Sequence, residues 1–277
     1  MTVGADRAEL RGLACRLAVT AGDLAAAGRH TDLDGAAADA AGGRSALAAT
    51  TKSSATDVVT RHDRAAEESI VAGLAATRGD DAIVGEEGTD RHGSSGISWY
   101  IDPIDGTTNF LYGMPLWSTS VAAADGDGAL AGAVYVPATG ELFAAARGDG
   151  ATRNGVPIRA SAEDDVALTL VCTGFGYTPE RRALQAMRLA SIAPRVRDLR
   201  RTGSAAIDLC YTAAGFFDAY YEEHLNSWDM AAGELIAREA GCRSGDFAGG
   251  PPRPEQLLVA GPHVFDALRE LIASTSS

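Results

Sequence analysis

The pattern of apolar and polar positions changes along the chain from helical repeats to short strand-like runs and then to an alternation of the two. Leucine and alanine recur at helical spacing over about 6–29, and a second helix is predicted near 62–78. Strands are predicted at 82–85, 117–124, 130–136 and 141–146. The last three of these strands form a predicted antiparallel meander.

Strands and helices alternate in the second half of the chain. Predicted strands lie at 168–174, just before Arg200, at 217–222 and at 257–260. Predicted helices lie at 180–192, 205–214, 228–240 and 264–272. This order predicts a layered α/β fold. We divide it into an α+β half at 1–160, which carries the meander, and an α/β half at 161–277, with no linker long enough to separate them.

The sequence predicts little about one stretch of the first half and a great deal about another. The Ala/Gly-rich segment 35–50 has little pattern, and we interpret it as a variable, mobile connection. The segment 99–110 begins as a buried strand and ends as a turn that opens a helix, with Asp102 and Asp105 at the junction. The proline between them forces Asp102 into an extended conformation, so both carboxylates can face one point beside the Ile104 carbonyl.

Gly106 allows a sharp turn, and the amides that follow it can face a ligand. Carboxylates and a carbonyl suit a hard cation, and helix-start amides suit a phosphate, so the segment predicts a magnesium-dependent phosphatase. An isolated Asp-x-x-Asp is more typical of a capped turn. Three further features favour a site: Glu86 after a strand, Asp229 at a helix start, and small residues at 203–206. Taken singly, the last two also fit a helix cap and close helix–sheet packing.

Composition narrows the class of protein. The chain has 277 residues, of which 46% are hydrophobic and 22% charged, and a formal charge of −13. This charge argues against nucleic acid as a partner, because phosphate backbones select basic surfaces. The four scattered cysteines are expected to be buried thiols in a reducing compartment. We find neither a signal peptide nor an apolar run of membrane-spanning length, and expect a cytoplasmic protein with no membrane partner.

Two motifs resemble the signatures of the inositol monophosphatase family, within the lithium-sensitive, magnesium-dependent sugar-phosphatase superfamily. They are Asp-Pro-Ile-Asp-Gly-Thr-Thr-Asn-Phe at 102–110 and Trp-Asp-x-Ala-Ala-Gly at 228–233. The resemblance begins near Lys52 and continues to the C-terminus, and the stretches 173–177 and 197–201 look like actinobacterial members. It implies a phosphoric monoester hydrolase, an α-β-α-β-α sandwich and a homodimer.

The resemblance also implies roles for the acidic residues. One metal ion would be held by Glu86, Asp102 and the carbonyl of Ile104, and a second by Asp102, Asp105 and Asp229. Glu86 would help to hold a third, looser Mg²⁺. Thr107 would orient the attacking water and be hydrogen-bonded to Asp63, and the amides of Gly106 and Thr107 would grip the phosphate.

Substrate contacts follow from the same resemblance. Glu222 matches a carboxylate that binds a ring hydroxyl, and Gly203, Ser204 and Ala205 match a backbone segment over that ring. The chain departs from the vertebrate enzymes, which have histidine at Asn226 and threonine at Ser204. Cys242 also replaces a glycine that usually ends the last signature. These changes affect the preference for inositol phosphate and not the metal chemistry.

The predicted function is hydrolysis of myo-inositol monophosphate or a related cyclitol or sugar phosphate. Histidinol phosphate is the main rival substrate, and an aminocyclitol or nucleoside phosphate of a specialised pathway is another. An alternative of a different class is a protein-binding role in a transcription complex. The four acids Glu86, Asp102, Asp105 and Asp229 favour catalysis, because converging carboxylates repel one another without metal.

Overall fold

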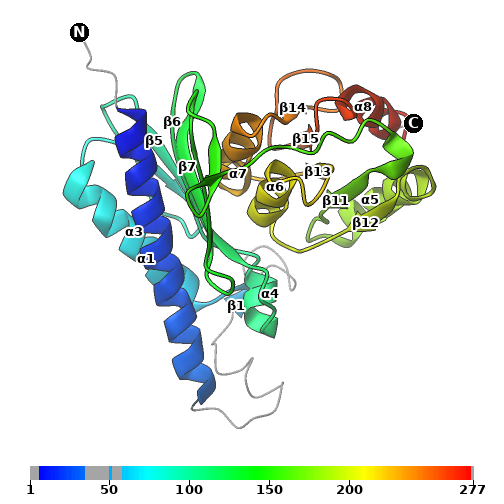
Figure 1. The fold of residues 1–277 in the computed structure, drawn as a ribbon. Helices are drawn as coiled ribbons and strands as arrows, with labels where there is room; N and C mark the ends of the chain where they lie inside the picture. The colour runs from blue at the N-terminus through cyan, green and yellow to red at the C-terminus, as the bar shows by residue number, and fades with distance from the viewer. Residues whose placement is uncertain (1–5, 35–49, 52–57, 276–277) are drawn as a thin grey trace.

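The computed structural model describes residues 6–34, 50–51 and 58–275 (Figure 1). The first half of the chain forms an eight-stranded sheet of order β10-β9-β8-β7-β6-β5-β3-β4. Its strands are β3 Ala82–Gly85, β4 Asp90–Arg91, β5 Ser98–Asp105, β6 Ser118–Asp125, β7 Gly128–Val136, β8 Glu141–Ala146, β9 Ala151–Arg153 and β10 Val156–Pro157. Neighbours are antiparallel except β3 and β5, which run parallel. Separately, β1 Thr50–Thr51 pairs with β2 Val58–Val59.

The second half forms a five-stranded sheet of order β12-β11-β13-β15-β14. Its strands are β11 Leu170–Thr173, β12 Asp198–Arg200, β13 Ala219–Glu223, β14 Arg243–Gly245 and β15 Gln256–Ala260. Strands β12, β11 and β13 are mutually parallel neighbours, whereas β15 is antiparallel to β13 and β14. The loops that follow the three parallel strands therefore leave the sheet at one edge.

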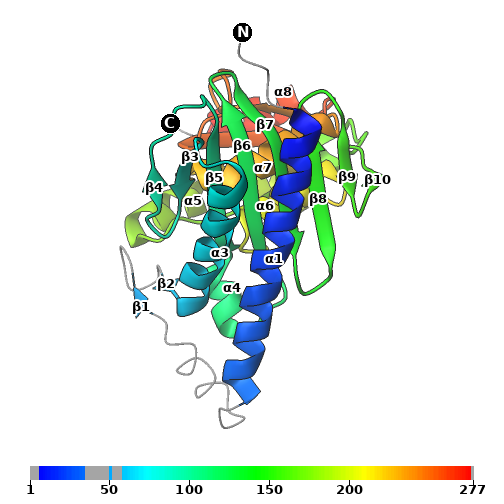
Figure 2. The same ribbon diagram turned by 90° about the vertical axis from the view of Figure 1, so that its left-hand side faces the viewer.

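Layers of helices alternate with the two sheets, so that one helix layer lies between the sheets and one covers the outer face of each (Figures 1 and 2). The outer layer on the large sheet is α1 Arg7–Asp34 and α3 Arg61–Thr77, the middle layer α6 Ala205–Ala213 and α7 Ser227–Glu239, and the outer layer on the small sheet α5 Pro179–Ile192 and α8 Phe265–Ala273. The remaining helical segments are α4 Thr107–Tyr112, η1 Val166–Leu168 and η2 Ala193–Arg195. This arrangement confirms the predicted α-β-α-β-α sandwich.

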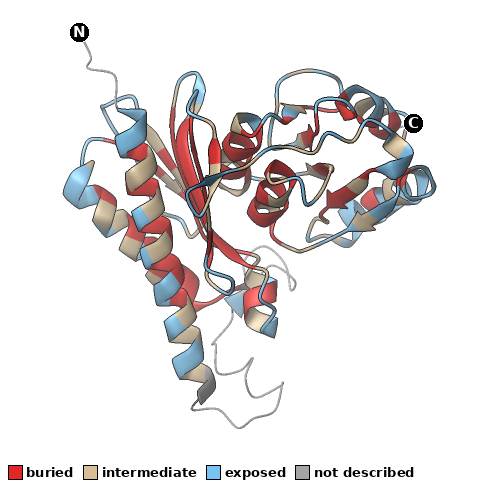
Figure 3. Ribbon diagram, in the orientation of Figure 1, coloured by how far each residue is buried: buried red, intermediate tan, exposed pale blue. Residues whose placement is uncertain are grey.

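Buried apolar residues lie on both sides of the middle helices (Figure 3). One core lies between α1, α3 and the large sheet, and a second core packs α6 and α7 between the two sheets. Helix α7, from the second half, packs on β6, β7 and β8 of the first half. The division near residue 160 follows the two sheets and stays a prediction, because the halves share this second core.

Most predicted elements agree with the structure to within a few residues. The first helix continues beyond the predicted end, to Asp34. The two- and three-residue strands β4, β9, β10 and β14 were not predicted, because strands this short carry too little periodicity to recognise. Of the segment 35–50, only Thr50 lies within the described residues.

The structure also bears on the sequence expectations for the cysteines and for membrane-spanning segments. Cys172, Cys210 and Cys242 are buried and Cys15 is partly buried, and all four are thiols. None of the helices in the described ranges is long and apolar enough to cross a bilayer.

The central strand differs from its prediction in where the turn begins. Strand β5 extends through Asp105, and its pairing with β6 is irregular between Asp102 and Asp105. Gly106 then takes a left-handed conformation with φ of 94°, and α4 starts at Thr107. A side chain other than that of glycine would be strained at this turn. Both carboxylates therefore lie on the buried end of β5 and not in the turn that follows it.

Candidate active site

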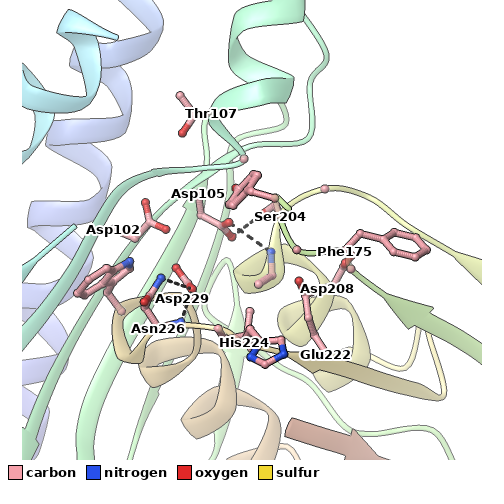
Figure 4. A pocket seen from close by; sticks show the side chains of 18 of the residues that line it. Asp102, Asp105, Thr107, Phe175, Ser204, Asp208, Glu222, His224, Asn226 and Asp229 are labelled. Atoms are coloured by element: carbon pink, nitrogen blue, oxygen red, sulfur yellow. Dashed lines mark hydrogen bonds between the residues drawn. The ribbon is translucent and has the colours of Figure 1, made fainter. Parts of the chain in front are cut away.

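A cavity of about 340 Å³ lies where loops of the large sheet face the small sheet and the starts of α6 and α7. Every residue predicted to bind metal or substrate lines it. Figure 4 shows Asp102, Asp105 and Asp229 around one end of this space, and Glu222 and Asp208 toward the other. We call these the acid end and the alcohol end of the cavity. Thr107 also lines the cavity, whereas its predicted partner Asp63 does not.

The parallel pairing of β3 with β5 places Glu86 beside Asp102. Gly85 pairs with Ile101, and the Glu86 amide donates to the Ile101 carbonyl at 3.1 Å. The two carboxyl groups lie within hydrogen-bonding reach of one another. Because the residues are sixteen positions apart in sequence, their proximity depends on the strand register and not on local structure.

Helix starts hold two of the acids by their backbone amides. The Asp105 carboxylate accepts from the Ser204 hydroxyl and the Ala206 amide, both at 2.6 Å, and from the Ala205 amide at 3.3 Å. The Asp229 carboxylate accepts from the Asn226 amide at 2.6 Å and from its side-chain nitrogen at 3.3 Å. Since helix N-termini favour negative charge, both carboxylates are oriented and partly stabilised as anions.

Burial and like charge work against ionisation of the same acids. Desolvation, followed by repulsion from Glu86, Asp105 and Asp229, raises the pKa of Asp102 well above its usual range. Burial raises the pKa of Asp105 to about 6, although the amides of α6 oppose the shift. The pKa of Asp229 is also raised well above its ordinary value by burial. A cation in this space would relieve both the desolvation and the repulsion.

The donor set fits hard cations such as Mg²⁺, because it consists of carboxylate oxygens and one carbonyl. The Ile104 carbonyl accepts a hydrogen bond from the Thr107 hydroxyl at 3.1 Å, which leaves one lone pair for a further contact. Within the described residues, no three acidic, histidine or cysteine side chains are gathered closely enough to form a metal site by themselves. The assignment of metal ligands therefore stays a prediction.

Thr107 is connected to α3 through Asp63. The Thr107 hydroxyl lies 3.3 Å from one Asp63 oxygen, and the other oxygen accepts from the amide and the hydroxyl of Thr60 at 2.8 and 2.6 Å. Thr60 and Asp63 form the capping box that begins α3. The fully buried Asp63 is thus held by its own helix while it faces Thr107.

The alcohol end carries the predicted substrate contacts. Glu222 accepts from the Tyr220 hydroxyl at 2.7 Å, and burial raises its pKa to about 7. Gly203 lies in the adjacent loop with φ of 99°. The Ser204 hydroxyl and the Ala205 amide donate to Asp105, and the predicted contact of the backbone at 203–205 with a substrate ring stays a prediction.

Some residues that shape the cavity have no local sequence signal. Glu67 on α3 accepts from the amides of Glu87 and Thr89 at 2.9 and 3.1 Å, and so fixes the turn that carries Glu86. Asp208 lines the cavity and accepts from the Thr202 hydroxyl at 2.5 Å. Both are acidic residues within amphipathic helices, where solvent exposure is the ordinary expectation, yet Glu67 and Asp208 are buried.

Comparison with known proteins identifies this fold and these motifs. The model of the inositol monophosphatase family matches residues 6–277. The chain belongs to the inositol monophosphatase family. Its members hydrolyse phosphate monoesters, so the chain is a phosphatase.

The similar proteins include actinobacterial ones, as the sequence predicted. An inositol-1-monophosphatase of Mycobacterium leprae is 43% identical over 251 residues, which cover 87% of this chain and 85% of the relative. The structure of Mycobacterium tuberculosis SuhB matches with a TM-score of 0.81 and 35% identity and covers 98% of both chains. A protein named Nus factor SuhB from Pasteurella multocida is 40% identical over 203 residues, 73% of this chain and 76% of the relative.

Proposed function

We propose that this chain hydrolyses myo-inositol monophosphate or a closely related cyclitol or sugar phosphate, with two to three Mg²⁺ ions. The observation that carries this proposal is the cavity wall made by Glu86, Asp102, Asp105 and Asp229, which come from three separate elements. A phosphatase of this family has a use for four acids that line one cavity, whereas a simple hydroxyl-binding site has none. The relative named inositol-1-monophosphatase supports the choice of substrate class.

The acids would divide the ions between them. Glu86, Asp102 and the Ile104 carbonyl would hold one ion, and Asp102, Asp105 and Asp229 a second, with Glu86 sharing a third. When bound, the ions supply positive charge that offsets the phosphate and favours attack of water on phosphorus. The backbone amides that donate hydrogen bonds to Asp105 and Asp229 would orient both carboxylates before the ions bind.

The chain itself would orient the attacking water through Thr107. When its one hydrogen points to Asp63 and not to the Ile104 carbonyl, the hydroxyl can accept from the water, so that the water oxygen faces phosphorus. The water oxygen forms the new bond to phosphorus, the bond to the alcohol oxygen breaks, and the alcohol leaves with a proton. The amides of Gly106 and Thr107 at the start of α4 would bind the phosphate oxygens. No covalent intermediate on the protein is required.

The alcohol end would select the substrate. Glu222 would accept hydrogen bonds from polyol hydroxyls, with Asn226 and the loop at Gly203 beside it. Histidinol phosphate and aminocyclitol or nucleoside phosphates stay as rival substrates, because the same acid end serves any phosphate monoester.

A panel of esters tests the proposal directly. Hydrolysis of myo-inositol 1-phosphate, histidinol phosphate, an aminocyclitol phosphate and a nucleoside monophosphate would be compared in Mg²⁺ and after EDTA treatment. We expect Mg²⁺-dependent release of phosphate, inhibition by lithium, and the highest kcat/KM for the inositol ester. Undiminished release from metal-free protein would refute the metal mechanism, and preference for another ester would reassign the substrate.

A role in a transcription complex is the second candidate function, and it rests on the relatives named Nus factor SuhB. Affinity capture with purified RNA polymerase and Nus factors would test it independently of hydrolysis. Association with that complex, together with no hydrolysis of any ester in the panel, would replace the first proposal by the second.

We also propose a cytoplasmic homodimer. Sedimentation at micromolar concentration should give a species heavier than the 28.5 kDa chain. A single 28.5 kDa species across the concentration range would contradict the dimer.

A further inference from the structure

Two arginine side chains line the alcohol end of the cavity, and the proposed hydrolysis uses neither of them. Arg181 lies in the first turn of α5, and Arg201 lies between β12 and α6. Both are exposed. Among the described residues, Arg188 and Arg200 form ion pairs, whereas Arg181 and Arg201 form none. Two positive groups thus border a cavity whose other charged groups are almost all acidic.

The parallel strands of the small sheet bring these arginines to the same edge as Glu222. Cys172 on β11 pairs with Arg200 on β12, so Arg201 lies level with the end of β11. On the other side of β11, Thr173 pairs with Tyr221, which places Glu222 one step further. Adjacent strands are about 4.8 Å apart. The β11–α5 loop, the β12–α6 loop and the end of β13 therefore build one wall.

Glycines make room for both arginine side chains in this wall. A Cβ on Gly203 would lie 2.8 Å from Nη1 of Arg201, and a Cβ on Gly176 would lie 3.2 Å from Cδ of Arg181. The guanidinium of Arg201 thus lies against the loop predicted to contact the substrate, and the stem of Arg181 packs on the loop after β11. A Cβ at Gly203 would require the Arg201 guanidinium or Asn109 to shift, and a Cβ at Gly176 would crowd the stem of Arg181.

We infer that Arg181 and Arg201 form an anion subsite, so that a cyclitol or sugar phosphate whose alcohol moiety carries a second anionic group, a phosphate or a carboxylate, is hydrolysed better than the same ester without that group. Guanidinium groups bind both anions through paired N–H donors. A neutral polyol would need only hydroxyl partners such as Glu222, and the acids of the cavity would repel a second anion unless cations faced it. The inference rests on the proposed phosphatase function and specifies its substrate.

One alternative explanation uses Arg201 only as a counter-charge. Arg201 lies close enough to Glu222 for the two charges to attract. In that case its loss would disturb Glu222 and slow every polyol phosphate alike. Arg181 has no such acidic neighbour among the described ion pairs. A comparison of substrates that differ in one group separates the two explanations.

The test compares glucose 1-phosphate, glucose 1,6-bisphosphate and glucuronic acid 1-phosphate, which differ only at C6. The wild type, Arg181→Gln, Arg201→Gln and the double variant would be assayed in Mg²⁺. Arg182→Gln and Arg200→Gln are matched controls, because Arg182 donates to the Tyr177 carbonyl and Arg200 pairs with Asp198. Circular dichroism and thermal melting would verify that each variant is folded.

We expect the wild type to prefer one of the doubly anionic esters over glucose 1-phosphate by at least tenfold in kcat/KM. Each arginine substitution should reduce this ratio about 10- to 100-fold, and neither control should change it. The bisphosphate and the glucuronic ester distinguish phosphate from carboxylate as the second group. Equal kcat/KM for all three esters, or a preference that survives in the double variant, would overturn the inference. A wild type that hydrolyses none of these esters or inositol phosphate would instead overturn the proposed function.

Discussion

Gly174 provides a sharp test of the alcohol end, because its lack of a side chain leaves space for Glu222. A Cβ on Gly174 would lie 2.0 Å from one carboxylate oxygen of Glu222 and 2.2 Å from its Cδ. Ordinary contact begins near 3.4 Å. Gly174 does not have a positive φ, so alanine strains no backbone there. Gly174→Ala should therefore act only by displacing the Glu222 carboxylate.

The required displacement is more than about 1 Å, which is enough to break the 2.7 Å hydrogen bond from Tyr220 and to misplace a bound polyol. Loss of one charge-assisted hydrogen bond costs about 1–3 kcal/mol, or roughly 5- to 150-fold in kcat/KM. Glu222→Gln should give a loss of the same order, because it removes the charge without moving the chain. An aryl phosphate offers no hydroxyl and should change little.

The assay measures kcat/KM for myo-inositol 1-phosphate and for p-nitrophenyl phosphate at fixed Mg²⁺. Gly126→Ala is the matched control, since a Cβ at Gly126 meets no atom within 4 Å and its φ is not positive. The reasoning fails if Gly174→Ala retains wild-type activity on the inositol ester. It also fails if either Gly174→Ala or Glu222→Gln slows both esters by the same factor, because Glu222 would then support the acid end or the fold.

Three further predictions concern the acid end. Asp102→Asn should abolish nearly all turnover at saturating Mg²⁺, since one carboxylate is proposed to serve two ions, and normal turnover would contradict this role. Thr107→Ala should lower kcat about 10²- to 10⁴-fold with unchanged Mg²⁺ dependence; weakened metal affinity with normal kcat would assign Thr107 to the metal site. In EDTA-treated protein, burial raises the pKa of Asp105 from 3.8 to about 6, so the folded chain binds this proton more tightly than the unfolded chain. The contribution of Asp105 to the free energy of unfolding should fall by about 2 kcal/mol as the pH rises from 4 to 6. The Tm difference between Mg²⁺-treated and EDTA-treated protein should widen over this range, and a narrowing would contradict the prediction.

The sequence by itself determined the elements that carry the acids, because their signals are local. Pro103 and Gly106 specify an extended segment followed by a sharp turn, and an apolar run before Glu86 specifies β3. Asp63 and Asp229 occupy third positions of helices, where a carboxylate caps the start. The two motifs at 102–110 and 228–233 were sufficient to indicate the family.

Only the tertiary structure decided which groups face one another across the cavity. Asp105 is held by Ser204 and the start of α6, about 100 residues away, because α6 packs between the two sheets. Glu222 fits against Gly174, and Arg201 reaches the same wall, because β12, β11 and β13 pair in parallel in one register. Strand register and helix packing are long-range properties that depend on burial of the whole apolar surface. Local patterns and motifs therefore predicted residues of both ends of this site, and the fold revealed what surrounds them, including Gly174, Arg181, Arg201 and Asp208.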